Sequence, residues 1–218
     1  MCGIVGYIGP KSVDSVLLVG LTRLEYRGYD SAGVAVLDKG ELQVRKEKGK
    51  IKDLEELLQA HPIEGNMGIG HTRWATHGEP NRQNAHPHVG TGTPSRIAVA
   101  HNGIIENHYE LRVELQREGH VFHTESDTEV IPHLIEQALS EGKSIEEALR
   151  TTIERLEGRY AFVMVYDAEP DRIFFARDGS PLVFGKGRNE CFLASDIPAI
   201  VPLARESYVF ENGQCGWI

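Results

Sequence analysis

The sequence predicts an α+β domain in which helices cover stacked β-sheets. Eight runs are strand-like, and some, such as 161–165, are apolar at every position, which is typical of strands buried on both faces. Three other stretches carry apolar residues at helical spacing. Because these stretches do not alternate strictly along the chain, stacked sheets covered by helices are favoured over a doubly wound sheet.

The predicted strands, in chain order, occupy 3–8, 33–37, 42–46, 67–71, 97–101, 160–166, 173–176 and 191–194. The predicted helices occupy 13–24, 130–139 and 145–156. The first follows Pro10, which suits an early helical position. Ser126 with Glu129, and Ser144 with Glu147, have the spacing of capping boxes at the start of the other two. No repeat or linker divides the chain, so we expect a single domain over residues 1–218.

Composition excludes several classes of protein. The 218 residues include 23 Lys and Arg against 32 Asp and Glu, giving a net charge of −9 with neutral histidines, whereas a nucleic-acid-binding surface is usually basic. No apolar run approaches the ~18 residues of a membrane-spanning helix. The first residues lack the basic segment of a secretory signal. We therefore expect a cytoplasmic protein with no nucleic-acid or membrane partner.

The three cysteines, Cys2, Cys191 and Cys215, are odd in number and widely spaced. This pattern supports neither a disulfide framework nor a zinc knuckle. Cys191 lies in a predicted strand and is expected in the core, since cysteine is usually buried. Cys215 remains open as a buried or a reactive thiol. Cys2 is distinguished by its position next to Met1.

Removal of Met1 would leave Cys2 with a thiol and a free α-amine. Methionine aminopeptidases generally act when the second residue is small, so we expect this processing. The α-amine has a reference pKa of ~7.7–8.0 and the thiol one of ~8.5, so the amine can accept the thiol proton near neutral pH. Cys2 then combines a nucleophile with its own base. From the dipeptide alone, a chance Met-Cys start remains the alternative.

Six motifs occur in order along nearly the whole chain: CGIVGY at 2–7, EYRGYDSAG at 25–33, HTRWATHGEP at 71–80, NAHPH at 84–88, HNGIIEN at 101–107 and TESDTE at 124–129. Together they resemble the class II glutamine amidotransferases, which are N-terminal-nucleophile hydrolases. The YRGYD and RWATHGEP forms are most similar to the glutaminase domains of the glucosamine-6-phosphate synthase family.

The resemblance implies an αββα four-layer sandwich. It further implies that Cys2 attacks the side-chain amide of L-glutamine, giving a thioester that water hydrolyses to glutamate, with release of ammonia. In the family this ammonia serves the synthesis of glucosamine 6-phosphate from fructose 6-phosphate. The phosphosugar isomerase domain for that step is expected to be absent from this chain. The full-length enzyme is expected to be a homo-oligomer without a cofactor.

By the same resemblance, the Asn102 side chain and the Gly103 backbone N–H stabilise the oxyanion of the tetrahedral intermediate. Removing one such donor typically costs ~10²–10³ in rate. From local sequence alone, an Asn-Gly pair after the strand 97–101 favours a strand-end turn instead.

Recognition of free glutamine requires a cation for its α-carboxylate and an anion for its α-ammonium. The resemblance assigns the carboxylate to Arg73, assisted by Thr76 and His77, and the ammonium to Asp127. The alternatives are a solvated charge at a strand end for Arg73 and a helix-capping role for Asp127. Trp74 lies in an expected mobile loop, 74–80, that covers the ligand in the family.

Two further residues have supporting roles by resemblance. Arg27, in the turn 27–30, is expected to orient the N-terminus, with a plain helix-to-strand loop as the alternative. His86 is expected at the rim of the active site.

Ten histidines, including His86 and His88 with His71, His77 and His101 nearby, raise the alternative of a metal site. No HExxH motif is present, the cysteines are remote in sequence, and proline between His86 and His88 restricts both rings. We therefore expect no metal.

Two other functions remain open at this point. A non-catalytic ligand-binding or regulatory module would keep the fold while a retained Met1 blocks the amine. An N-terminal-nucleophile hydrolase acting on another amide is disfavoured, because Arg73 and Asp127 suit a free amino acid.

Overall fold

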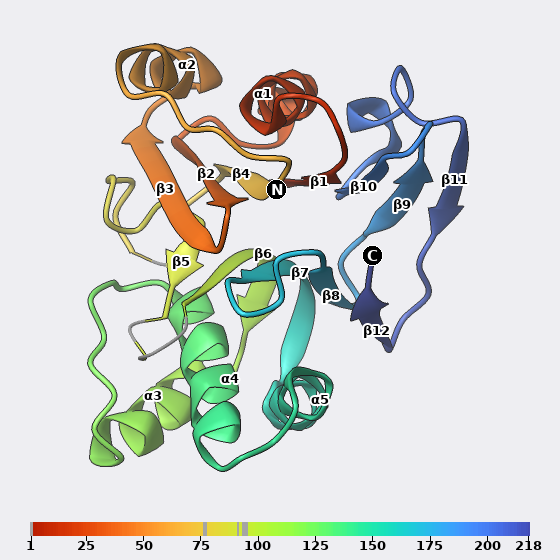
Figure 1. The fold of residues 1–218 in the computed structure, drawn as a ribbon. Coiled ribbons are helices and arrows are strands. Elements are labelled where there is room, and N and C mark those ends of the chain that lie inside the picture. Colours follow the sequence, from red (N-terminus) through yellow and green to blue (C-terminus); the bar gives the residue numbers. More distant parts are fainter. Residues whose placement is uncertain (1, 76–77, 91, 93–95) are drawn as a thin grey trace.

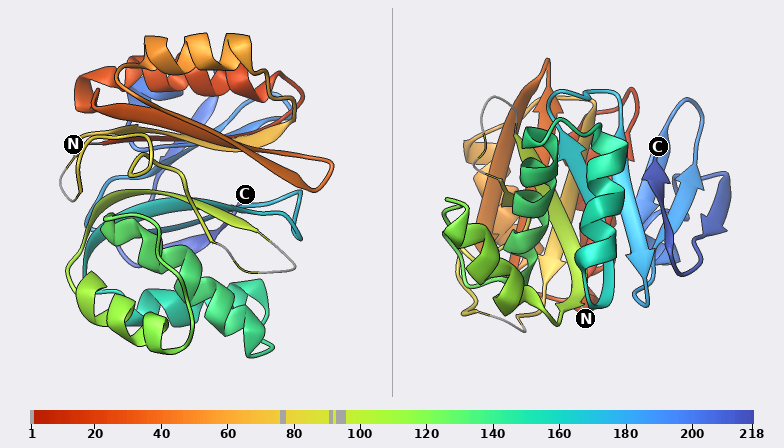
Figure 2. Two further views of the ribbon diagram at one scale, coloured as in Figure 1. Left: turned by 90° about the vertical axis from the view of Figure 1, so that its left-hand side faces the viewer. Right: turned by 90° about the horizontal axis from the view of Figure 1, so that it is seen from below.

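The computed structural model describes residues 2–75, 78–90, 92 and 96–218. Within these residues the elements stack in four layers: two helices, a seven-stranded sheet, a five-stranded sheet and three helices (Figure 1, Figure 2). The predicted α+β class is confirmed, and so is the αββα four-layer sandwich that the resemblance implied.

The larger sheet has the strand order β11-β9-β10-β1-β4-β2-β3, and all neighbouring strands are antiparallel. Its strands are β1 (Gly3–Ile8), β2 (Ser31–Asp38), β3 (Glu41–Lys48), β4 (Met67–Arg73), β9 (Val183–Lys186), β10 (Cys191–Ala194) and β11 (Glu206–Val209). The central pair, β1 and β4, leads directly to the candidate site described below.

The smaller sheet has the order β12-β8-β7-β6-β5 and is also antiparallel throughout. Its strands are β5 (His88–Val89), β6 (Ile97–Ile105), β7 (Gly158–Tyr166), β8 (Ile173–Asp178) and β12 (Gln214–Trp217). Its long central strands β6 and β7 pair along their whole length, from Ile97 with Tyr166 to Ile105 with Gly158.

Five α-helices among the described residues form the outer layers. Helices α1 (Val13–Arg23) and α2 (Ile51–Ala60) cover the larger sheet, and α3 (His108–Arg117), α4 (Val130–Ser140) and α5 (Ile145–Arg155) cover the smaller one (Figure 2). Apolar side chains fill all three interlayer spaces. Along β7, Phe162 packs toward the helices while Val163 packs between the sheets. Burial on both faces explains why this strand is apolar at every position.

All eight predicted strands and all three predicted helices are present, although several begin or end a few residues away. Helices α2 and α3, and strands β5, β9, β11 and β12, were not predicted. The four missed strands have only two or four residues each, and α3 buries only Leu111 and Leu115, so their periodic signals are weak.

The two predicted capping boxes differ in outcome. Ser144 Oγ accepts from the Glu147 N–H at 3.3 Å, and the Glu147 carboxylate accepts from the Ser144 N–H at 2.9 Å, so this box is confirmed. The box at Ser126 is wrong. Ser126 Oγ accepts from Thr128 N–H in the 3₁₀ turn Asp127–Glu129, while the Glu129 carboxylate accepts the N–H groups of His123 and Thr124.

The exposure of the two later cysteines corrects the prediction for Cys191 and decides the open case of Cys215. Cys191 is half-buried at the start of β10, so its placement in the core is wrong. It lies opposite Ile8 at the end of the β1–β10 ladder, where the strand emerges from the layers. Cys215 is exposed.

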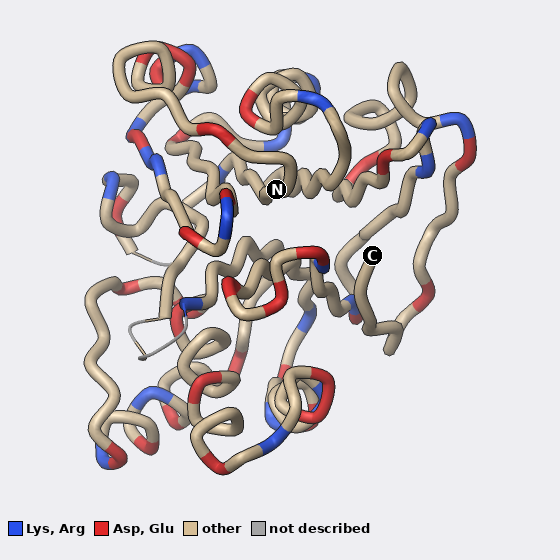
Figure 3. The backbone as a smooth tube through the Cα atoms, in the orientation of Figure 1, with Lys and Arg blue, Asp and Glu red and all other residues tan. Residues whose placement is uncertain are grey.

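Charged residues lie mainly on helices, turns and strand ends, and acidic and basic positions are interspersed (Figure 3). Among the described residues, no helix has the length and apolar character needed to cross a membrane.

One buried ionic cluster anchors α4 to the preceding loop. The His133 side chain is fully buried, with Nδ1 3.3 Å from Glu136 Oε2 and Nε2 3.9 Å from Glu129 Oε1. Burial alone would lower the pKa of His133, but the two carboxylates raise it above its usual value. Burial likewise opposes ionisation of Glu129, yet His133 and the hydrogen bonds from residues 123 and 124 bring its pKa to about 2.

This arrangement predicts a pH-dependent contribution of His133 to stability. Because its pKa is raised on folding, the stabilisation is fully present below the unfolded pKa of ~6.5 and is lost as the pH rises through the folded pKa. The difference in unfolding free energy between wild type and His133→Gln, measured with urea, should therefore shrink as the pH rises from 6 to 9. The same difference in a Glu136→Gln background should be smaller. A difference that is constant with pH would contradict the ion pair.

Candidate active site

Antiparallel pairing of β1 with β4 places Cys2 beside the end of β4. Gly3 is opposite Thr72 in the ladder, so the residue before β1 reaches the segment that begins at Arg73. The Trp74 N–H donates to Cys2 Sγ at 3.2 Å, and Sγ is 3.5 Å from the Trp74 carbonyl oxygen. The thiol therefore lies against the main chain where the HTRWATHGEP motif leaves the sheet.

The surroundings of Cys2 favour its thiol form. Burial raises the pKa of Cys2, and the Trp74 N–H and the Arg73 guanidinium only partly oppose this effect. The hydrogen-bond partners of Sγ among the described residues are the two main-chain groups of Trp74, neither of which accepts a proton at neutral pH. Reaction at this sulfur consequently needs a base from elsewhere in the site.

The carbonyl oxygen of Cys2 is held by two side chains. Arg27 Nε donates to it at 2.9 Å and Asn102 Nδ2 at 3.0 Å. Arg27 is buried and also forms an ion pair with Asp196, Nη1 to Oδ2 at 2.8 Å, while the Tyr26 hydroxyl donates to the same carboxylate. This arrangement supports the predicted orienting role of Arg27 and disfavours a plain connecting loop.

Gly28 allows the Arg27 turn to approach the site. A Cβ at Gly28 would lie 2.6 Å from the Arg73 carbonyl carbon and 2.8 Å from the Trp74 nitrogen. Main-chain atoms cannot move aside easily, so a side chain at position 28 would separate this turn from the end of β4.

Asn102 and Gly103 lie within a strand. β6 continues to Ile105, with Asn102 opposite Ala161 and Gly103 opposite Tyr160, so the strand-end turn interpretation is wrong. Gly103 has a φ of +130°, and a Cβ there would collide with the Arg159 carbonyl oxygen. The glycine is therefore required by the backbone.

Arg73 and Asp127 are both buried, at 3% and 4% exposure. Burial lowers the pKa of Arg73, and the nearby Cys2, Asp127 and Asp30 oppose that shift. The alternative interpretation of Arg73 as a solvated charge at a strand end is therefore wrong. Asp127 Oδ2 accepts the Ile105 N–H at 2.9 Å, which fixes this carboxylate against β6. Ser126, and not Asp127, accepts a hydrogen bond as the cap of the following turn.

The loop after β4 is only partly described. Trp74 is 44% exposed and packs edge-on against Tyr29, with ring centroids 5.6 Å apart. Thr76 and His77, which were predicted to assist Arg73, lie outside the described residues. Asn84 holds the later part of the loop, since its Nδ2 donates to the Glu79 carbonyl and the Glu125 carboxylate.

His86 does not lie at the rim of the site, as we expected, but beneath it. It is buried, stacks on His71 at a centroid distance of 4.1 Å, and packs edge-on against His88 at 4.6 Å. Its Nδ1 accepts the His101 N–H at 3.3 Å. Burial lowers the pKa of all four of these histidines, so they are neutral at pH 7.

Sequence reasoning missed several residues that support the site. Asp196, which holds Arg27, carried no signal beyond its residue type. Thr128, whose Oγ1 lies 2.7 Å from His101 Nδ1, lay within the TESDTE motif but was given no role. His71 and His101 lay within recognised motifs but were considered only as possible metal ligands.

A group with metal-binding potential in the described residues is His120, His133 and Glu136, whose ligand atoms lie within 4.8 Å of one another. It contains none of the candidate active-site residues. His120 Nδ1 lies 3.1 Å from His133 Nδ1, and His133 is also within ion-pair distance of Glu129 and Glu136.

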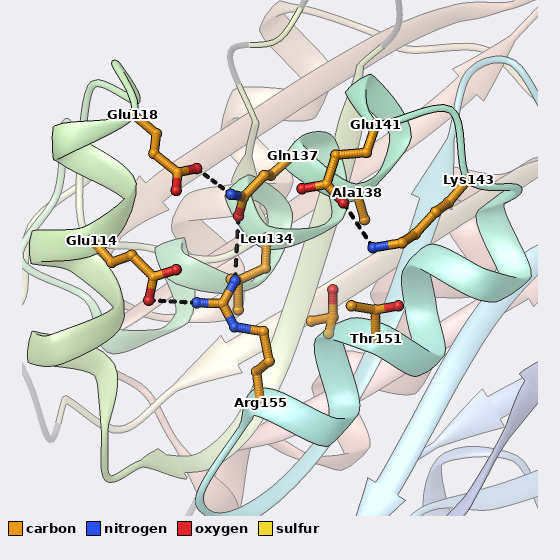
Figure 4. Close-up of a pocket in the computed structure, with 10 residues that line it drawn as sticks. Glu114, Glu118, Leu134, Gln137, Ala138, Glu141, Lys143, Thr151 and Arg155 are labelled. Atoms are coloured by element: carbon orange, nitrogen blue, oxygen red, sulfur yellow. Dashed lines mark hydrogen bonds and ion pairs between the residues drawn. The ribbon is translucent and has the colours of Figure 1, made fainter.

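A hollow of about 330 Å³ lies between α3, α4 and α5 (Figure 4). Cys2 is not among the residues that line it. Its charges are largely paired internally: Arg155 binds Glu114 at 2.7 Å and Lys143 binds Glu141 at 2.8 Å. The hollow therefore offers little uncompensated charge to a ligand, and the cluster around Cys2 is the candidate site.

Comparisons with known proteins show what this chain is similar to. A family model described as glutamine amidotransferase domain matches residues 71–202. Glutamine–fructose-6-phosphate aminotransferase [isomerizing] from Pyrococcus horikoshii is 50% identical over 99% of this chain and 36% of its own length. The protein of the same name from Symbiobacterium thermophilum is 54% identical over 98% of this chain and 34% of its own length. The chain thus spans about a third of these relatives.

Solved structures share the fold. The glutamine phosphoribosylpyrophosphate amidotransferase from B. subtilis, complexed with ADP and GMP, superposes with a TM-score of 0.84 and 26% identity over all of this chain and 49% of its own. A structure described as the allosteric regulatory enzyme of purine biosynthesis gives a TM-score of 0.85 and 26% identity, over all of this chain and 48% of its own.

The contacts of Arg27 make a prediction about the site's architecture. Arg27→Lys keeps the charge but cannot reach both the Cys2 carbonyl and Asp196, so it should lower the free energy of unfolding by roughly 1.5–3 kcal/mol. Urea denaturation measures this change. Arg23→Lys, at an exposed position in α1, is the matched control and should stay within about 0.5 kcal/mol of wild type. Equal effects of the two substitutions would contradict the role given to Arg27.

Proposed function

Because this chain belongs to the glutamine amidotransferase family, as its motifs indicated, we propose that it hydrolyses L-glutamine to glutamate and ammonia with Cys2 as the nucleophile. The observation that carries the proposal is the grouping of Cys2 with buried Arg73, buried Asp127 and Asn102. These residues supply a nucleophile, a cation, an anion and an amide donor from separate elements.

The base in this mechanism is the α-amine of Cys2 after removal of Met1. It takes the thiol proton, and the sulfur attacks the side-chain amide carbon of glutamine. A base on the same residue suits a site in which burial raises the pKa of the thiol and the described partners of Sγ are not bases. While Met1 is attached, the nitrogen is an amide and cannot perform this step.

Attack produces a tetrahedral oxyanion, for which the donors are Asn102 Nδ2 and the Gly103 N–H. As the intermediate collapses, the protonated amine returns its proton to the leaving nitrogen, ammonia departs and a γ-glutamyl thioester remains. Water then attacks the thioester, glutamate leaves, and the thiol is restored. The two donors stabilise charge that develops only in the transition state, so they contribute mainly to kcat.

Substrate selection rests on charge. Arg73 pairs with the α-carboxylate of glutamine and Asp127 with its α-ammonium, so the free amino acid is distinguished from a peptide. Thr76 and His77 assist Arg73, and Trp74 covers the ligand. Both charged residues are already buried, so water competes little with the ligand for them.

We further propose that the ammonia serves a phosphosugar isomerase domain that converts fructose 6-phosphate to glucosamine 6-phosphate, in the first stage of hexosamine synthesis. The names of the aminotransferase relatives, and the third of their length that this chain spans, support such a partner domain. Residues 1–218 act here as one glutaminase domain, and the complete enzyme is a cytoplasmic homo-oligomer without a cofactor.

The second candidate, a regulatory module with Met1 retained, is separated from the enzyme by intact mass and turnover. Loss of one methionine with glutamate release from glutamine, and little from the shorter asparagine, supports the enzyme. Retention of Met1 with no turnover favours the module.

Replacing Cys2 tests the nucleophile. Cys2→Ala should abolish glutamate release while leaving the thermal unfolding midpoint nearly unchanged, because Cys2 precedes β1 and belongs to none of the three core clusters described. Cys191→Ala, which removes a half-buried thiol far from Arg73 in sequence, is the matched control and should retain kcat. Appreciable turnover by Cys2→Ala would exclude the N-terminal nucleophile.

Replacing the charged pair tests recognition. Arg73→Lys loses the two-pronged contact with a carboxylate, and Asp127→Asn loses the charge while an amide oxygen can still accept the Ile105 N–H. Each should weaken glutamine binding by roughly 2–5 kcal/mol. Alkylation of Cys2 by iodoacetamide, followed by peptide mass spectrometry, should change far less, because that reagent carries neither charge. A parallel loss of alkylation would mean that these residues support the nucleophile or the fold.

A further inference from the structure

His71 contacts the Asn102 side chain from beneath the site. It lies in β4 at 0% exposure, and its Nε2 is 2.9 Å from the His101 carbonyl oxygen and 3.1 Å from Asn102 Oδ1. Both neighbours are acceptors, so Nε2 must carry a proton and donate to both. The other ring nitrogen, Nδ1, is buried without a hydrogen-bond partner among the described residues. The geometry therefore selects the Nε2–H tautomer.

This donor determines which way the Asn102 amide points. With Oδ1 held by His71, the amide nitrogen faces Cys2 and donates one hydrogen to its carbonyl oxygen at 3.0 Å. In the flipped orientation, Oδ1 would face the carbonyl oxygen of Cys2, and the amide N–H groups would face the Nε2–H of His71. Both hydrogen bonds would be replaced by like-to-like contacts, which is costly for buried groups.

The ring of His71 is also fixed in place and in charge. It stacks on His86, with centroids 4.1 Å apart and planes 16° from parallel. Burial lowers its pKa to about 3, so it remains a neutral single donor over the pH range in which the protein would work. A neutral ring orients the amide without adding a second buried cation beside Arg73.

We propose that His71 is a positioning residue that orients the Asn102 amide so that its N–H groups, and not its oxygen, face the oxyanion formed at Cys2. The role of Asn102 in this statement rests on the proposed function, whereas the tautomer and the hydrogen bond are properties of the folded chain alone.

Two substitutions at position 71 separate orientation from packing. His71→Met fills similar space without a hydrogen-bond donor. In His71→Gln, the side-chain amide nitrogen reaches about as far as Nε2 does and restores a donor. We expect His71→Met to lower kcat for glutamine hydrolysis about 10²-fold with little change in KM, since a misplaced group costs about that much. His71→Gln should recover most of the loss. The matched control is His88→Met, at a buried histidine that packs edge-on against His86, and it should keep kcat.

A double-mutant cycle with Asn102→Ala tests whether His71 acts through the amide. Once the amide is removed, His71→Met should cause little further loss, so the two effects should not add. Cys2 alkylation by iodoacetamide needs no amide oxyanion and should persist in every variant. Additive losses, no rescue by His71→Gln, or collapse of alkylation in His71→Met would overturn the proposal.

One readout is independent of activity. Nitrogen-15 NMR of the wild-type chain should show His71 as the Nε2–H tautomer, and an Nδ1–H tautomer would overturn the positioning role. If wild type released no glutamate although Met1 had been removed, the proposed function would fail, and the tautomer would still decide the orientation of Asn102.

Discussion

The carbonyl oxygen of Cys2 accepts the hydrogen bonds that connect the candidate site to both sides of the sandwich. Arg27, from the turn after α1, and Asn102, from β6 of the opposite sheet, each donate to this one atom. Cys2 precedes β1, so the β-ladder alone does not fix its carbonyl group. A charge-assisted hydrogen bond from one layer and an amide from the other do so instead. The position of the thiol therefore depends on the packing of the two sheets, not on one local motif.

The charges of the site suit a ligand that carries both signs. Arg73 and Asp127 are each almost fully buried, and burial of an ionised group is expensive unless another charge or hydrogen bonds compensate it. The Ile105 N–H stabilises Asp127, and the guanidinium lies in the field of Asp127 and Asp30. A zwitterionic amino acid would add a further opposite charge beside each without changing the net charge of the site.

The sequence predicted the fold class and the longer strands well, because these depend on apolar periodicity and on motifs that keep their order. It predicted poorly wherever the cause was a contact between distant residues. Asp196 lies 169 residues from its partner Arg27, and nothing near either residue indicates the pairing. The pair Asn102-Gly103 resembled a strand-end turn because Asn-Gly pairs usually form turns. In the structure, pairing with β7 extends β6 through both residues. His86 resembled a rim residue because stacking on His71 is visible only in three dimensions.

The buried histidines illustrate why such a site uses neutral donors behind its charged residues. A cation in place of His71 would attract an oxyanion more strongly, but it would add a second buried positive charge close to Arg73 and incur its desolvation cost. A neutral imidazole supplies only direction: its Nε2–H holds Oδ1 of Asn102, so that in the proposed mechanism the amide N–H groups face the oxyanion. The amide then stabilises the substrate oxygen mainly when negative charge develops on that oxygen. Such selective stabilisation raises kcat, whereas equal stabilisation of the ground state only tightens binding.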